Sequence, residues 1–171
     1  LTFDPMSQNE SLNNTFSDYV YDGLVRYNKQ FVPEPALATS WTRVSPTVWR
    51  FNLRKNVKFH DGTPMTADDV VFSFQRVLAP ASNMKVYAQG IKETKKIDDF
   101  TVEFEMTKVN PIFPDHIAQL WIMDKEWSEK NKATKPQDFK NKEEHFAAMN
   151  ANGTGPVMLV KREPGIKTTW Q

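Results

Sequence analysis

A run of alternating apolar and polar residues between Val48 and Phe59 constrains the fold of this chain more than any other feature of its sequence. The apolar members occupy the odd positions Trp49, Phe51, Leu53, Val57 and Phe59. Successive side chains of a β-strand point to opposite faces, so this period of two predicts a strand with one buried and one solvated face. We expect a bend at Lys55 and Asn56.

A capped helix is predicted directly after this strand. Asp61 and Gly62 form a turn, and Thr66 opens a Thr-x-x-Asp capping box in which its hydroxyl and the Asp69 carboxylate each satisfy a free amide of the first helical turn. Apolar residues then recur at the spacing of a single helical stripe: Val70, Val71, Phe74, Val77 and Leu78. Because Pro80 forbids continuation, the helix is expected to end just before it.

Further elements are expected on both sides of this pair. A helix from Ser7 to Gly23 carries the apolar stripe Leu12, Phe16, Tyr19 and Val20. Pro33 and Pro35 interrupt the chain, because proline cannot donate to a strand ladder. The other patterns predict a strand at 24–27, a hairpin of 91–97 and 100–106, short helices at 111–120, 124–131 and 146–149, and a strand re-entering a sheet at 157–160. This order predicts an α+β fold with a mixed sheet.

Composition excludes several classes of function. The chain has 22 Lys and Arg against 21 Asp and Glu, so it has no excess positive charge with which to bind nucleic acid. It contains no cysteine, which excludes disulfides, thiolate metal sites and a cysteine nucleophile. No run approaches the roughly 18 apolar residues of a membrane-spanning helix. The sequence opens at Leu1 without a signal peptide and stops on an ordered pattern at Gln171, so we expect that both ends are cuts.

Few residues suggest catalysis. His60 and Asp61 form an adjacent histidine–carboxylate pair in a predicted loop, and a hydrolase using them is the alternative from a different class of function. His60 falls on the polar face of the predicted strand and Asp61 begins a turn, so a structural role is favoured for this pair. Helix capping accounts for Asp68 and Asp69. The loop 152–156 resembles a phosphate loop only superficially, because no lysine follows it and its proline removes an amide. We predict no catalytic residue, no metal and no cofactor.

The order of these motifs resembles that of a known family. The landmarks are Leu1-Thr2-Phe3-Asp4-Pro5, Tyr21-Asp22-Gly23-Leu24-Val25, Pro35-Ala36-Leu37-Ala38 with Ser40-Trp41, Trp49-Arg50-Phe51-Asn52-Leu53-Arg54, the block from Val57 to Val70, and Gly153-Thr154-Gly155-Pro156. They are similar to the family 5 extracellular solute-binding proteins, the dipeptide- and oligopeptide-binding proteins of ABC importers. The stretch from Phe51 to Val77 is the most specific part, since its residues, turn and capped helix recur in the family's order and spacing.

The resemblance implies a fragment of a two-lobed, type II periplasmic-binding-protein-like fold with an accessory domain. Residues 1–22 would be the opening segment of the first lobe, residues 23–150 the accessory α/β domain, and residues 151–171 the return into the first lobe, with the second lobe absent. The implied function is to bind a small peptide and deliver it to the membrane permease of an ABC importer, without catalysis. The implied location is the periplasm, or the outer face of a Gram-positive cell membrane through a lipid anchor.

The resemblance also places ligand-binding residues. The segment in which the family's first lobe offers an extended edge to the ligand falls on Asn9, Glu10 and Ser11, and such an edge suits a peptide through backbone pairing. Asn9 stands where peptide-binding relatives have an acidic residue, and Glu10 is next to it. By position, a groove aromatic maps onto Tyr87 and a polar residue onto Gln119.

Several alternatives stay open. Relatives on the same scaffold take nickel chelates, oligosaccharides or opine-like solutes instead of peptides. A stand-alone adhesion or antigenic module is a further possibility. The apolar face that the remainder of a first lobe would cover also predicts that the chain self-associates.

Overall fold

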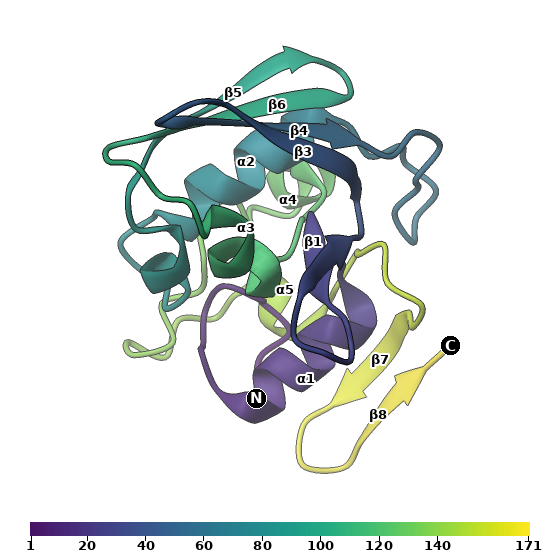
Figure 1. Cartoon of the computed structure of the whole chain (residues 1–171). Coiled ribbons are helices and arrows are strands. Elements are labelled where there is room, and N and C mark those ends of the chain that lie inside the picture. The colour runs from purple at the N-terminus through teal and green to yellow at the C-terminus, as the bar shows by residue number, and fades with distance from the viewer.

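The structure is a computed structural model that describes residues 1–171 (Figure 1). Its helices are α1 (Ser11–Val20), α2 (Ala67–Val77), α3 (Phe113–His116), α4 (Lys125–Lys130) and α5 (Phe146–Met149), with the 3-10 turns η1 (Lys85–Ala88) and η2 (Ile117–Gln119). Its strands are β1 (Val25–Tyr27), β2 (Pro33–Pro35), β3 (Ala38–Ser45), β4 (Val48–Leu53), β5 (Ile91–Asp98), β6 (Thr101–Met106), β7 (Leu159–Glu163) and β8 (Lys167–Trp170). None of the helices has the length and apolar character that crossing a membrane requires.

The largest sheet has four strands in the order β3-β4-β6-β5, and all of its pairings are antiparallel, so the expectation of a mixed sheet is wrong. It forms the upper layer in Figure 1, and α2 runs beneath it. Trp49, Phe51 and Leu53 are buried on the covered face, whereas Arg50 on the outer face pairs with Glu103 of β6. The alternation of the sequence is therefore confirmed as that of a strand with one covered face.

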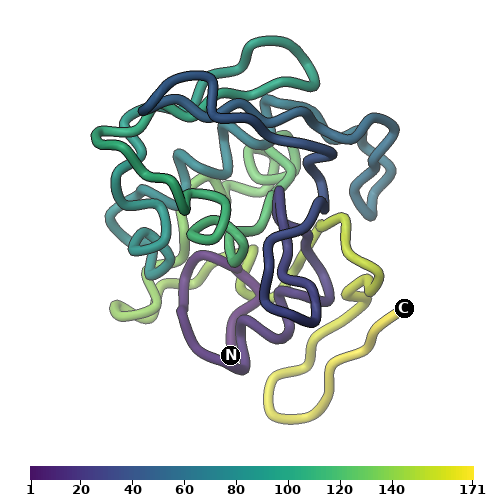
Figure 2. The backbone as a smooth tube through the Cα atoms, in the orientation of Figure 1, coloured from purple at the N-terminus to yellow at the C-terminus, as the bar shows by residue number.

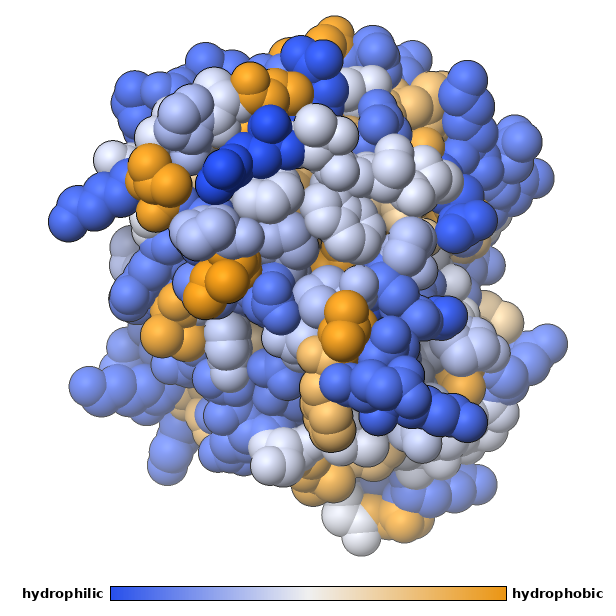
Figure 3. Space-filling view, viewed as in Figure 1, coloured by the Kyte–Doolittle hydropathy of each residue, from blue (hydrophilic) through white to orange (hydrophobic).

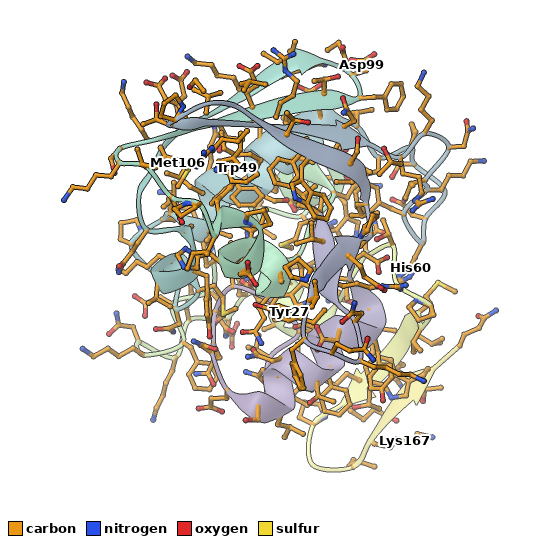
Figure 4. All side chains as sticks on the ribbon, in the orientation of Figure 1. Tyr27, Trp49, His60, Asp99, Met106 and Lys167 are labelled. Atoms are coloured by element: carbon orange, nitrogen blue, oxygen red, sulfur yellow. The ribbon has the colours of Figure 1, made fainter.

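Aromatic side chains form the centre of the core beneath this sheet. The ring of Phe104 has centroid distances of 5.4 Å to Phe51, 4.6 Å to Phe74 and 5.1 Å to Phe113. These rings come from β6, β4, α2 and α3, so one cluster joins the sheet to both helices. Trp49, labelled in Figure 4, extends the cluster through its contact with Phe113.

Two features of the sheet differ from the sequence expectation. The strand expected to reach Phe59 ends at Leu53, because Asn56 takes a left-handed backbone conformation with φ 61° that interrupts the ladder. Phe59 is nevertheless buried beyond this bend. The neighbouring strand β3 shows no alternation, since Ala38 is its one buried residue, and periodicity therefore does not predict it.

Pro33 and Pro35 lie in a strand, and the prediction that they interrupt the chain is wrong. β2 pairs with β1 in a separate two-stranded ribbon, with Val25 opposite Pro35 and Tyr27 opposite Pro33. Proline is tolerated there because the edge of a ribbon has amide positions that need no partner.

Helix α1 is shorter than predicted and turns a different face inward. Its buried residues are Asn13, Ser17 and Val20. Leu12 and Tyr19 of the expected apolar stripe are 59% and 52% exposed. In the lower part of the molecule, where Figure 1 places α1, Figure 3 shows apolar residues at the surface.

The chain ends in a hairpin of β7 and β8 that joins neither of the other sheets. Figure 2 shows this hairpin beside α1, away from the main body. Trp170 of β8 stacks on Phe16 of α1 with the ring centroids 5.6 Å apart. The expectation of a last strand is confirmed, but the strand pairs only with its own continuation.

Residues 153–157, which we call the returning chain, cross the C-terminal end of α1 and lead to β7. The amides of Gly155 and Val157 donate to the carbonyls of Val20 and Tyr19, at 2.9 and 3.0 Å. A Cβ atom on Gly153 would overlap the Val20 carbonyl, so a residue without a side chain is required there. Segments far apart in the sequence thus form one seam between α1 and the residues that lead to β7.

Candidate ligand-binding site

The segment that carries the predicted ligand residues begins at a buried ion pair. Arg76 of α2 donates from Nη1 and Nη2 to the two carboxylate oxygens of Asp4, each at 2.7 Å, and both side chains are fully buried. Burial alone would raise the pKa of Asp4, but the Arg76 guanidinium and the amides of Gln137 and Met6 hold that pKa below its usual value. Asp4 is therefore a charged anchor for the N-terminal segment.

Two loops hold the residues that follow Asp4. The amide of Asn83 donates to the Met6 carbonyl at 3.0 Å, just before η1. On the other side, the Ser7 hydroxyl donates to the Gln137 carbonyl at 3.1 Å. These contacts position the next residues relative to η1, whose third residue is Tyr87.

Residues 8–10 precede α1 and belong to no helix or strand. Glu10 has φ −127° and ψ 143°, and its side chain makes no capping hydrogen bond to α1. The backbone amides of Gln8, Asn9 and Glu10 donate to no group of the chain. Asn9, Glu10 and Ser11 are all exposed. An extended backbone with free amides can pair with the backbone of a peptide.

The structure brings two of the predicted residues into contact. Asn9 Nδ2 donates to the Tyr87 hydroxyl oxygen across 3.4 Å. Gln119 is exposed on η2, and η2 packs against η1, although Gln119 itself makes no hydrogen bond to the other predicted residues. We call the surface made by residues 8–11, Tyr87 and Gln119 the ligand ledge.

Sequence patterns do not identify the residues that position the ledge. Asn14 Nδ2 donates to Asn9 Oδ1 at 3.1 Å, and Arg76 anchors Asp4 from a helix 72 residues away. Asn14 lies five positions after Asn9, and no helical or strand periodicity relates the two. Arg76 and Asn83 contact the N-terminal segment only because the folded chain brings them beside it. The sequence of neither segment carries a pattern that predicts these contacts.

His60 and Asp61 hold the returning chain. His60 Nδ1 accepts from the Gly153 amide at 3.4 Å, and Nε2 donates to the Gly155 carbonyl at 2.8 Å, so both ring nitrogens are occupied. Figure 4 labels His60 on the side of the molecule where the chain returns towards β7. Burial alone would raise the pKa of Asp61, but hydrogen bonds from the amide and hydroxyl of Thr63 keep it below its usual value. This geometry favours the structural role over the hydrolase.

Three acidic residues meet where α2 and α4 begin. Oxygens of Asp69, Asp124 and Glu126 lie within 4.8 Å of one another. Asp69 accepts from the amides of Thr66 and Lys125 at 2.8 and 2.9 Å, so one carboxylate serves the N-termini of both helices. Asp124 caps α4. The predicted capping box is thus confirmed, and it has a second use that the sequence does not reveal.

Comparison with known proteins identifies the family. The model of the bacterial extracellular solute-binding proteins, family 5 (middle part), matches residues 32–171. The chain belongs to this family. Among curated family 5 proteins, it is 36% identical to the periplasmic oligopeptide-binding protein OppA of Escherichia coli over 113 residues, which cover 55% of this chain and 21% of OppA.

Solved structures of family 5 proteins share the fold of nearly the whole chain. The periplasmic binding protein DppA of Helicobacter pylori, in complex with the peptide STSA, gives a TM-score of 0.82 at 26% identity, covering 99% of this chain and 36% of DppA. NikZ of Campylobacter jejuni, in complex with Ni(L-His), gives a TM-score of 0.82 at 26% identity, covering 99% of this chain and 33% of NikZ. The chain therefore spans about a third of the length of these family 5 structures.

Proposed function

We propose that this chain forms one side of the ligand site of a peptide-binding family 5 protein. The observation that carries the proposal is the segment of residues 8–10, which is extended at Glu10 and whose amides donate to no group of the chain, together with the hydrogen bond between Asn9 and Tyr87. Family membership and the peptide ligands in the names of OppA and DppA support it. A bound peptide would pair its backbone with the ledge as an added strand.

In this proposal the protein binds its ligand without transforming it and delivers it to the permease of an ABC importer. The compartment would be the periplasm, or the outer face of a membrane to which a lipid anchor ties the protein. A receptor of this kind pairs each polar group of the ligand as water leaves, because an unpaired buried group costs about 1–3 kcal/mol. One ledge contacts only one side of a peptide, so the partner lobe would supply the remaining contacts.

We also propose a division at residues 1–22, 23–150 and 151–171 into the first lobe, an accessory domain and the return to the first lobe. The seam supports it, because Val20 and Gly155 join the two proposed boundaries by a hydrogen bond of 2.9 Å. The Thr154 hydroxyl adds a bond of 2.8 Å to the Asp22 carboxylate.

A small chelate is the second candidate ligand. The similarity to NikZ, whose ligand is Ni(L-His), supports a chelate, and the similarity to a binding protein in complex with mannopinic acid supports an opine-like solute equally well. The exposed side chains of Asn9, Glu10 and Gln119 offer amide and carboxylate oxygens to such a ligand.

Titration of the ¹⁵N-labelled chain with trialanine, followed by NMR, tests the proposal. We expect amide resonances of residues 8–11 to shift, with a dissociation constant weaker than about 1 μM because half of the contacts are missing. Trialanine methylated on its central amide is the matched control and should shift them less. Shifts confined to other regions, or shifts produced only by Ni(L-His), would exclude the peptide proposal. Binding at about 1 μM or tighter would exclude the need for a partner lobe.

A further inference from the structure

Phe31 combines two unfavourable properties at the tip of the β1–β2 ribbon. Its backbone has φ 57°, in the left-handed region, where a residue with a bulky side chain is an outlier. The residue is also 81% exposed, so its ring lies largely in water. Neither the backbone conformation nor burial in the core accounts for a phenylalanine at this position.

The other two-stranded hairpin has glycine at its left-handed residue. In the loop between β7 and β8, Gly165 has φ 75°. Glycine adopts this conformation readily, and it is the usual residue where a hairpin loop requires it. The loop between β1 and β2 instead keeps a large side chain there, at a conformational cost. Residues held in such conformations cluster at ligand-binding sites, so the outlier indicates a binding role for Phe31.

Hydrogen bonds around Asn28 fix the loop that carries Phe31. Asn28 Oδ1 accepts from the amides of Gln30 and Val32 at 2.9 and 3.0 Å, and the Asn28 amide donates to the Val32 carbonyl at 3.0 Å. The Phe31 amide donates to the Asn28 carbonyl at 3.0 Å. These bonds order the backbone beneath the ring before any ligand binds. A contact residue on an ordered loop loses less entropy on binding.

Contacts between neighbouring elements connect the ribbon to the ligand ledge. The Phe31 ring lies beside that of Tyr27 in β1, with the centroids 6.4 Å apart. The Tyr27 hydroxyl, labelled by its residue in Figure 4, donates to the Asp115 carbonyl at 3.0 Å, in α3 just before η2. β1 packs against η2, and η2 packs against η1. Because η2 carries Gln119 and η1 carries Tyr87, the ribbon continues the ledge on the side of Gln119.

The ribbon adds apolar surface that the ledge lacks. Tyr27, Phe31 and Val32 are all exposed. The side chains of the ledge offer amide, carboxylate and hydroxyl groups, which match the polar groups of a peptide but not an apolar side chain. We propose that Phe31 is a specificity-determining residue whose ring contacts an apolar side chain of the bound peptide. This inference rests on the proposed function, because the peptide that it concerns is the ligand of the ledge.

The variants Phe31→Gly and Phe31→Ala separate the conformational cost from the ring. Glycine relieves the left-handed conformation, so Phe31→Gly should raise the melting temperature of the ligand-free chain by about 2–4 °C. Alanine removes the ring but keeps a Cβ atom, so Phe31→Ala should not raise it. A melting temperature of Phe31→Gly below that of the unchanged chain would show that the ring supports the fold, and it would overturn the binding role.

NMR titrations with trialanine and trileucine test the contact with the ligand. We expect the unchanged chain to bind trileucine about threefold to tenfold more tightly, because the Phe31 ring covers part of one leucine side chain. Both Phe31 variants should lose this preference and bind trialanine as the unchanged chain does. Ile166→Ala is the matched control and should keep the preference, since Ile166 has the same exposed fraction of 81% in the β7–β8 loop.

The outcomes distinguish this inference from the proposed function. If the unchanged chain binds neither peptide, the proposed function fails and the role of Phe31 fails with it. If peptides bind but the unchanged chain has no preference, or Phe31→Gly keeps it, the proposed function stands and the role of Phe31 is excluded. Loss of self-association in Phe31→Gly, measured by sedimentation with the preference retained, would assign the ring to a contact between copies of the chain instead.

Discussion

Helices α1 and α2 have similar sequence patterns and opposite environments. Each carries an apolar stripe at helical spacing, yet Phe74 of α2 is 1% exposed and Tyr19 of α1 is 52% exposed. α2 lies under the four-stranded sheet and contacts β5 and β6, and Val70, Phe74 and Val77 of its stripe are buried. α1 instead turns Asn13 and Ser17 inward, and the Thr2 amide donates to Asn13 Oδ1 at 3.4 Å.

The contrast shows that periodicity identifies a stripe but not its partner. α2 also buries Arg76 and Ser73, which lie outside its expected stripe, whereas Leu78 of that stripe is exposed. Arg76 is buried because the buried carboxylate of Asp4 pairs with its guanidinium group. A helix surface is therefore buried wherever neighbouring segments supply matching groups, whether these groups are apolar or charged.

Removal of the buried charge on α2 should have the largest effect. We expect Arg76→Ala to lower the free energy of unfolding by about 3–5 kcal/mol, because Asp4 is left buried without its partner. Urea denaturation measures the change. Arg26→Ala is the control: the Arg26–Glu34 pair is exposed and should contribute at most about 1 kcal/mol. Similar losses in the two variants would show that the anchor is no stronger than a surface pair.

Asp69, in the first turn of α2, should make the free energy of unfolding depend on pH. Burial raises the pKa of Asp69 to about 6 from a usual 3.8, and the carboxylates of Glu126 and Asp124 add to the shift against the lowering effect of the amides of Lys125 and Thr66. The folded state therefore holds a proton that the unfolded state releases between these two values. This group's contribution to stability is largest below pH 4 and falls as the pH rises through 6.

The contribution of Asp69 to the free energy of unfolding should decrease by about 2–3 kcal/mol between pH 4 and 7, because one pKa unit corresponds to about 1.4 kcal/mol. Asp69→Asn cannot ionise, so its unfolding free energy should lack this part of the slope, although its absolute stability falls with the weakened caps. Denaturation curves of both proteins at several pH values give the difference. Parallel pH profiles would exclude a raised pKa for Asp69.

Changes in the exposed stripe of α1 should have the smallest effect on stability. Leu12→Ser and Tyr19→Ser should each change the free energy of unfolding by no more than about 0.5 kcal/mol, because both side chains are already largely in water. We propose that this stripe mediates self-association, so the double variant should remain monomeric at concentrations where the unchanged chain forms larger species in sedimentation experiments. A monomeric unchanged chain at high concentration would contradict this proposal.

Part of the candidate site is predictable from sequence. The resemblance maps ligand-binding roles onto Asn9 and Tyr87, and these roles stay predictions; the structure shows that the two side chains lie in contact. It does not identify Asn14, whose side chain contacts Asn9, or Arg76, which pairs with Asp4. No pattern within one segment predicts either contact, because each contact depends on where a second segment lies in the fold.

By itself, the sequence determined the local elements: the alternation around Phe51, the capping box at Thr66 and the glycine-rich turn near Gly153. These depend on neighbours within a few residues, whose geometry is set by strand pleating, free helical amides and the lack of a side chain. Only the tertiary structure decided which face of α1 is buried and what Asp4 pairs with. Burial is a property of contacts between distant segments, and the free energy of a charged or apolar group depends on what those segments bring to it.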